Sequence, residues 1–311
     1  MTRNHIGVDL SKDALDICDP RRGEARIANE AAAIARWIAG LGADDTIVYE
    51  ATSRCDRPLR LALREAGHAG VRLNPLHAWH FGRSLNRAKT DRLDAAMLAR
   101  LGAERQPAPD AQLDPAREEL RGLVQRRDQL KRMETQEKNR LSDCFLALVA
   151  RDIRAELANL ARRIERIEQA IANHLARHPA LGVAERLLRS IPGFGAVTAM
   201  TLLAHLGELG SVDRRAIASL GGVAPRAHES GRTRGRRFPG EGRRHVRRAL
   251  YMASLSALRH PGFLADFVAR MKAAGKPGKV ILMAVARRLL TLANAILGSG
   301  IPFQPRNAAA T

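Results

Sequence analysis

Aromatic residues, cysteines and long apolar runs are all scarce in this 311-residue chain. Aromatics make up only 4% of it, so leucine, alanine, valine and isoleucine must build the core. Cys18, Cys55 and Cys144 show no CxxC pair and no partner-histidine spacing, which argues against a disulfide framework and against a zinc site. No uncharged apolar stretch reaches the ~18 residues of a spanning helix, and the first residues lack the apolar segment of a signal peptide. We therefore expect a cytoplasmic protein.

Acidic residues are also few relative to basic ones. The chain holds 52 lysines and arginines against 32 aspartates and glutamates, which gives a net charge of +20. Such a surplus favours a polyanionic partner, because neutralising phosphates releases their condensed counterions. Nucleic acid is the leading candidate, and an anionic membrane surface is the weaker one. A GC-rich genome would explain the choice of arginine over lysine, but not the excess of base over acid.

The N-terminal third alternates between strand and helix patterns. The hydrophobic pattern and the turn residues predict strands at 5–10, 14–18, 25–29, 45–51 and 70–75, and helices at 30–41, 57–67 and 86–102. This alternation predicts an α/β domain with a central sheet over residues 1–103.

The rest of the chain has helical patterns. Residues 104–183 begin with a proline-rich linker and continue as two long helices. Apolar residues spaced by three and four form a seam on the second of them, at Leu157, Leu160, Ile164, Ile167, Ile171 and Leu175. This seam is typical of a coiled coil between subunits or of a hairpin within one chain, and both remain open. Residues 184–311 form a third, mainly helical domain, with a helix–turn–helix pattern over 187–207 and helices near 246–258 and 279–298.

Four carboxylates in the first domain are candidate metal ligands. Asp9 lies in the first strand, Glu50 near the end of the fourth, and Asp91 and Asp94 share one face of a helix. Strand-end acids and a helical pair of this kind can meet at one edge of a sheet, and Mg²⁺ prefers such oxygen ligands. The alternative is a set of solvated surface acids. Asp9 fits that alternative poorly, because a charge inside IGVDL is costly unless it is paired or bound to metal.

Two further stretches suggest contact with phosphate. The IPGFGAVTA turn has Gly193 and Gly195 just before a helix, whose free N–H groups can bind a phosphate without reading sequence. A tight turn that needs glycine for steric reasons is the alternative. Residues 226–248 hold nine arginines, whose forked donors suit phosphate oxygens: Arg226, Arg232, Arg234, Arg236, Arg237, Arg243, Arg244, Arg247 and Arg248. Ser230, inside this run, is an ordinary turn serine on its own evidence.

These motifs together resemble a known family. The stretches IGVDLSKDALDI, YEAT and AKTDRLDAAMLARL are similar to the N-terminal RuvC-like DEDD domain of a family of bacterial insertion-sequence transposases, which are also described as bridge-RNA-guided recombinases. The stretches SLGGVAPRAHESG, RRALYMASLSALRHP and GKPGKVILMAVARRLL resemble its C-terminal transposase domain. The resemblance covers almost the whole chain. One departure is EATSRCDRP, where the family usually has Thr-Gly and then an aromatic residue.

The resemblance implies a fold, a site and partners. The fold would be α/β plus all-α: a RuvC/RNase H-like domain, a long coiled-coil connector, and a mainly helical transposase domain with a helix–hairpin–helix-like turn. Asp9, Glu50, Asp91 and Asp94 would hold Mg²⁺ or Mn²⁺, and Ser230 would attack a DNA phosphodiester. The partners would be element-end and target DNA, a structured guide RNA encoded by the element, and further copies of the chain, with dimers assembling into a tetramer. A membrane is not expected, and DNA binding would place the protein at the nucleoid.

Three functions follow as hypotheses. The first is a DNA transposase or recombinase that cleaves and rejoins strands. The second is a Holliday-junction-type nuclease, in which the acids activate water and Ser230 is idle. The third is a nucleic-acid-binding relative without activity. The four acids argue against this third hypothesis, because acids without a bound metal repel DNA.

Overall fold

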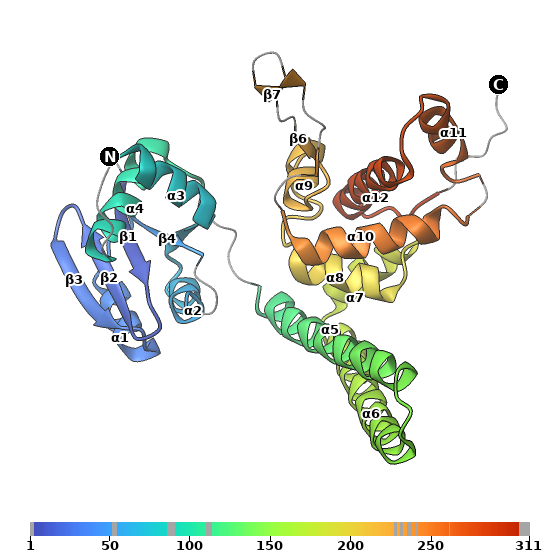
Figure 1. The fold of residues 1–311 in the computed structure, drawn as a ribbon. Coiled ribbons are helices and arrows are strands. Elements are labelled where there is room, and N and C mark those ends of the chain that lie inside the picture. Colours follow the sequence, from blue (N-terminus) through green and yellow to red (C-terminus); the bar gives the residue numbers. More distant parts are fainter. Residues whose placement is uncertain are drawn as a thin grey trace. The chain divides into compact units, whose positions relative to one another are not determined.

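A computed structural model describes residues 3–51, 55–85, 91–109, 114–226, 229–230, 233–234, 238–239, 242–260 and 262–304. Of residues 91–93 and of the short strands from 226 to 239 it describes the backbone alone. The chain divides into two units, Met1–Leu113 and Asp114–Thr311, which are drawn together in Figure 1 and described separately below.

A five-stranded sheet forms the centre of the first unit. Its strands are β1 (Asn4–Leu10), β2 (Ala14–Asp19), β3 (Gly23–Ala28), β4 (Asp45–Glu50) and β5 (Ala69–Leu73). The strand order is β3-β2-β1-β4-β5; β1 and β2 are antiparallel, as are β2 and β3, while β1, β4 and β5 run parallel. All five predicted strands are confirmed to within two residues at each end. The mixed α/β arrangement is consistent with a RuvC-like DEDD domain.

Helices cover both faces of this sheet. They are α1 (Ala31–Ala39), α2 (Arg57–Glu65), α3 (Pro75–Ser84) and α4 (Asp91–Arg105). The helices α1 and α2 share an apolar core with one face, and α3 and α4 share a second core with the other. The sequence pattern does not predict α3. Pro75 ends β5 as expected, but it also occupies the first turn of α3, where Asn74 caps the helix by accepting a hydrogen bond from the N–H of Leu76.

A hairpin of two long helices begins the second unit. It consists of α5 (Pro115–Ser142) and α6 (Ala147–Arg177), which pack along each other (Figure 1). Leu160 and Ile164 of the predicted seam are buried against Leu130 of α5. The seam therefore packs within one chain, and the hairpin alternative is the one that the structure shows for these positions.

The remaining helices join the base of the hairpin in a single core. They are α7 (Pro179–Arg189), α8 (Ala196–His205), α9 (Arg214–Leu220), α10 (Arg244–Ala257), α11 (Ala265–Ala273) and α12 (Gly278–Ser299). Leu120 of α5 and Ile171 of α6 belong to the same apolar cluster as α8, α10 and α12. The helix–turn–helix and the two closing helices are confirmed, whereas the sequence pattern predicts neither α9 nor α11.

One helix, α12, is long and apolar enough to cross a membrane by length and composition alone. It packs instead as a core helix, with Val285, Leu289 and Leu290 buried in the second unit and Arg287 and Arg288 within its length.

Candidate active site and nucleic-acid interface

Two of the predicted metal ligands lie at the same edge of the sheet. In the parallel pair of β1 and β4, Val8 is the register partner of Tyr49, so Asp9 and Glu50 follow at the next position of each strand. Side chains alternate between the faces of a sheet. Asp9 therefore shares a face with Gly7, and Glu50 shares a face with Val48, which packs in the core beneath α3 and α4. Both carboxylates are partly buried.

The helix α4 brings Asp94 to this edge. A Cβ on Gly7 would lie 1.9 Å from the carbonyl oxygen of Ala95 and 2.5 Å from the nitrogen of Ala99, so the two backbones touch here. Further along α4, a Cβ on Gly102 would lie 2.9 Å from the Cβ of His5, at the start of β1. The helix thus runs antiparallel to β1, and its first turn lies towards the end that carries Asp9.

Three elements therefore bring carboxylates to one edge of the sheet. Asp9, Glu50 and Asp94 are placed there by strand register and by the crossing of α4, and Asp94 is partly buried. Asp91 begins α4 three residues earlier, and its backbone lies in the same turn. A set of carboxylates without nitrogen or sulfur fits a hard divalent cation such as Mg²⁺. Residues 52–54, in the stretch that departs from the family pattern, lie outside the described residues.

Ser230 lies on a small β-hairpin in the second unit. The strands β7 (Glu229–Ser230) and β8 (Thr233–Arg234) pair antiparallel, with Ser230 opposite Thr233. Below them, β6 (Pro225–Arg226) pairs with β9 (Phe238–Pro239). The strands β6 to β9 thus form a paired arm within the arginine-rich stretch, called the arm below. Arg226 and Arg234 lie on its strands, while Arg232, Arg236 and Arg237 lie outside the described residues.

The foot of this arm is held by an ion pair and by a close backbone contact. Arg243 donates two hydrogen bonds of 2.5 Å to the carboxylate of Glu208. Burial raises the pKa of Glu208, but the hydrogen bonds from Arg243 and the positive charges of Arg243 and Arg117 together outweigh burial and hold that pKa below its ordinary value. A Cβ on Gly242 would lie 2.4 Å from the Cα of Gly222. Arg243 is therefore occupied in anchoring the arm, and the partly or fully exposed Arg244 and Arg248 remain directed to the surface.

A stacked pair of histidines lies beside this anchor. The rings of His205 and His245 are parallel to within 5°, with centroids 4.8 Å apart. Burial lowers the pKa of His205 to about 4, and the neighbouring His245 and the positive charges of Arg121 and Arg243 add to this effect. His205 is therefore neutral at physiological pH.

The two glycines of the IPGFG turn have different roles. Gly193 has a φ of +92°, and a Cβ on it would lie 2.6 Å from the nitrogen of Ala257 in α10, so packing alone explains this glycine. Gly195 is exposed, and a Cβ on it would meet no atom within 4 Å. It is the N-cap residue of α8 and offers no side chain to the free N–H groups there. Only at Gly195 does the turn stay open to a ligand.

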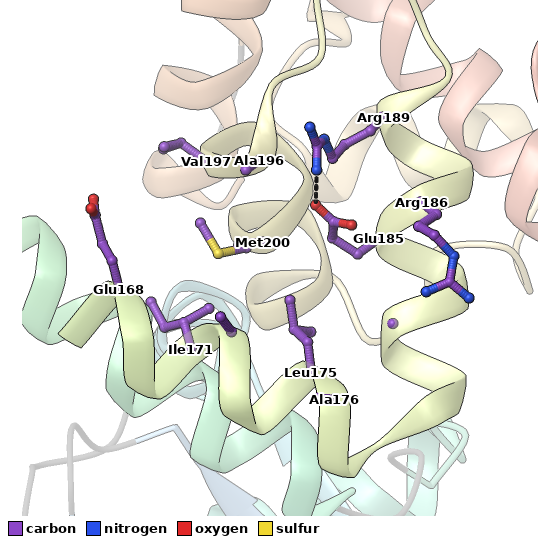
Figure 2. A pocket seen from close by; sticks show the side chains of 12 residues that line it. Glu168, Ile171, Leu175, Ala176, Glu185, Arg186, Arg189, Ala196, Val197 and Met200 are labelled. Atoms are coloured by element: carbon purple, nitrogen blue, oxygen red, sulfur yellow. Dashed lines mark hydrogen bonds and ion pairs between the residues drawn. The ribbon is translucent and has the colours of Figure 1, made fainter. Parts of the chain in front are cut away.

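A groove of about 550 Å³ lies beside this turn, between α6, α7 and α8 (Figure 2). Its floor is apolar, with Ile171, Leu175 and Met200. Arg186 and Arg189 stand on its α7 side, where Arg189 pairs with Glu185 at 3.5 Å. The groove has a mixed lining, and one of its two arginines is already paired.

Comparison with known proteins agrees with this arrangement. Residues 6–149 match the family model of the DEDD transposase domain of the IS110 type, described as a transposase. The match contains all four predicted acids, and it defines the class: a DEDD-type transposase. Residues 185–269, which contain the IPGFG turn and the arm with Ser230, match the model of the transposase IS116/IS110/IS902 family. Together the two matches support a transposase of the IS116/IS110/IS902 family.

Its relatives include proteins of two kinds. A pilin gene-inverting protein of Moraxella lacunata is 28% identical over 98% of this chain and 99% of its own length. A protein of insertion element IS110 in Streptomyces coelicolor is 28% identical over 52% of this chain and 39% of its own length. A protein of insertion element IS116 in Streptomyces clavuligerus is 31% identical over 38% of this chain and 30% of its own length. This similarity supports DNA binding, a DNA-cleaving activity in general and dependence on a divalent metal.

Proposed function

We propose that this protein is a DNA recombinase that cleaves and rejoins the strands of an insertion sequence and its target, with Ser230 as the nucleophile. The full-length relative from Moraxella lacunata, by its name, inverts a pilin gene, and an inversion is a recombination in which four ends are rejoined. That similarity over the whole chain favours a recombinase over a nuclease that only cuts.

The roles divide among three segments. The domain of residues 1–103 would hold Mg²⁺ or Mn²⁺ through Asp9, Glu50, Asp91 and Asp94. The ion, when bound, would polarise a phosphodiester and stabilise the oxygen that leaves it. The connector of residues 104–183 would carry the C-terminal domain of residues 184–311 and take part in assembly of dimers into a tetramer.

Ser230 would carry out the covalent step. Its Oγ forms a bond to phosphorus while one ester bond from phosphorus to a sugar oxygen breaks, and the hydroxyl proton passes to a base. A serine hydroxyl is a weak nucleophile, so the phosphate must be held and its charge compensated. The arginines of the arm have the charge and the donors for this role, namely Arg226, Arg232, Arg234, Arg236 and Arg237. Attack by a free strand end on the serine–phosphate bond would then rejoin the DNA.

The proposed nucleic-acid contacts extend to the IPGFG turn. The open N-terminus of α8 at Gly195 can receive a phosphate of the DNA or RNA backbone, since its first N–H groups have no partner within the helix. Gly193 would act indirectly, because it sets the turn through its packing on α10. A structured guide RNA would select the target, as the family resemblance implies, and its phosphates suit the net charge of +20.

The single observation that carries the proposal is the meeting of Asp9, Glu50 and the start of α4 at one sheet edge. The test is an adduct assay with the full chain, Mg²⁺ and DNA that contains the element ends. Wild-type protein should form a covalent protein–DNA species, and Ser230→Ala should lose it while still binding DNA. Asp94→Asn should lose both adduct and cleavage.

The same assay separates the alternatives. Cleavage that persists in Ser230→Ala, without any adduct, would show a water-activating nuclease. Binding with a steep salt dependence and no cleavage by the wild type would show a nucleic-acid-binding relative. An RNA that copurifies with the protein, identified by sequencing, tests the guide.

A further inference from the structure

A group of three potential metal ligands lies in the second unit, away in sequence from the DEDD acids Asp9, Glu50, Asp91 and Asp94. It consists of Glu119 on α5, His174 on α6 and His178 at the end of α6. One ligand atom from each of these residues lies within 4.8 Å of those of the other two. His174 lies in the last turn of α6, and His178, four positions later, is the C-cap residue of that helix. Their ring centroids are 4.4 Å apart.

The hydrogen bonding of His174 leaves one ring nitrogen free for a ligand. Its side chain is completely buried, and Nε2 lies 2.7 Å from the carbonyl oxygen of Ala116. A carbonyl oxygen only accepts, so Nε2 carries a proton. The other nitrogen, Nδ1, is buried and has no hydrogen-bond partner in the described part of the chain. In proteins, a metal-binding histidine usually donates its second N–H to a backbone carbonyl or a carboxylate in this manner.

Glu119 faces this nitrogen. Its Oε2 lies 3.4 Å from Nδ1 without forming a hydrogen bond to it, and its Oε1 lies 3.6 Å from Arg177. When Nδ1 is unprotonated, its lone pair and the carboxylate repel each other unless a cation lies between them. A buried nitrogen without a hydrogen bond costs free energy that a bound cation would recover.

We propose that Glu119, His174 and His178 bind one Zn²⁺ ion. Two nitrogens and one carboxylate oxygen suit zinc, and water would complete a tetrahedral site. Ligands of zinc at ~2.1 Å stand ~3.4 Å apart in that geometry, so the group must contract slightly. Glu119 is exposed and His178 is half-buried, so both side chains have room to turn while the buried His174 stays in place. The DEDD acids lack such nitrogen ligands, so the two sites prefer different ions.

The bound ion would join the start of the hairpin to its end. Glu119 lies in the second turn of α5, and His178 lies between α6 and α7. Both helices contribute to the core of the second unit at this level through Leu120 and Ile171. Zinc would therefore stabilise the base on which the long hairpin stands, independently of the chemistry at the DEDD acids.

The test uses the full chain with Asp9→Asn and Asp94→Asn, so that the acid site does not compete for the ion. Metal is removed with a chelator, and Zn²⁺ is titrated in the presence of a chromophoric zinc indicator. We expect one Zn²⁺ per chain, a rise in melting temperature with zinc, and the visible absorption of tetrahedral cobalt when Co²⁺ replaces it. His178→Ala and Glu119→Gln should each weaken zinc binding at least ~10-fold, since each removes one of three ligands.

His260→Ala is the matched control, because His260 is exposed and lies outside the group. It should bind zinc like its parent. The proposal is wrong if the parent chain binds no stoichiometric zinc, or if His178→Ala and Glu119→Gln bind zinc as tightly as His260→Ala. None of these readouts depends on recombination, so the result stands apart from the proposed function.

Discussion

The crossing of α4 over β1 offers a direct test of how the acid edge, the sheet edge with Asp9, Glu50 and Asp94, is assembled. The substitution is Gly7→Ala, which adds one methyl group at the point where the two backbones touch. That methyl would lie 1.9 Å from the carbonyl oxygen of Ala95, so α4 must move by about 1.5 Å to reach an ordinary contact of 3.4 Å. A second backbone atom, the nitrogen of Ala99, lies 2.5 Å away. Neither atom is the end of a flexible side chain, so neither can turn aside to relieve the strain.

The expected cost follows from this geometry. Overpacking of a core costs about 1–3 kcal/mol, and a clash with two backbone atoms belongs at the upper end, at ~3 kcal/mol. With a urea m-value of ~1.5 kcal/mol per M, the unfolding midpoint of the first unit should fall by ~2 M. Displacement of the start of α4 also moves Asp94 away from Asp9. A shift of ~1 Å in a catalytic group costs ~100-fold in rate, so cleavage should fall at least that far in protein that is still folded.

The assay exploits the position of the two tryptophans. Trp37 and Trp79 are the only tryptophans in the sequence, and both lie in the first unit, so their fluorescence in the full chain reports its unfolding alone. Gly40→Ala is the matched control: a Cβ there would lie 3.5 Å from the nearest atom, an ordinary contact, and the free energy of unfolding should change by no more than ~0.5 kcal/mol. An unchanged midpoint and full cleavage in Gly7→Ala would refute the crossing and the acid edge built on it.

Two further predictions concern the second unit. Ile164→Ala should lower the free energy of unfolding of the second unit by ~3 kcal/mol, because Ile164 is only 4% exposed in the hairpin core. The control is Leu148→Ala, at a 71% exposed position of the same helix, which should have little effect in far-UV circular dichroism melts. The mass in solution should stay unchanged in Ile164→Ala, and a change of mass would show that the seam forms a contact between subunits. The pKa of His205 is lowered from 6.5 to about 4, so the folded state keeps this side chain neutral. Below pH 6.5 the unfolded state binds a proton there and the folded state does not, so the free energy of unfolding is highest above pH 6.5 and decreases as the pH falls towards 4. The loss should be on the order of 3 kcal/mol, and His205→Phe should flatten the dependence of the urea midpoint on pH in this range; a parallel dependence in both proteins would contradict the assignment.

Much of the architecture could be predicted from local patterns. The five strands of the first unit carry runs of apolar residues bounded by turn formers, so their positions depend on neighbours in sequence. The helix α3 escapes this kind of prediction because Pro75 indicates the end of a strand, although Asn74 and Pro75 together also form a helix start. The zinc proposal likewise has a sequence signal, the spacing of His174 and His178, that a search for cysteines overlooks.

The seam at 157–175 could not be assigned from sequence, because a three-and-four spacing looks the same whether its partner is another subunit or another helix of the same chain. Only the packing of Leu160 and Ile164 against Leu130 decides this within the described residues.

The sequence by itself determined the chemical groups available to this protein: four candidate carboxylate ligands in the first domain, a serine among arginines in the last, and a charge suited to nucleic acid. Position depends on contacts between residues far apart in the chain. Register between β1 and β4 sets Asp9 beside Glu50, and the absence of a side chain at Gly7 lets α4 approach closely enough to add Asp94. Tertiary structure also showed that the two glycines of the turn have different roles, because packing on α10 accounts for Gly193, whereas Gly195 has open space around it. Local sequence patterns do not specify the distances between these residues, because those distances are set only when the strands and helices pack.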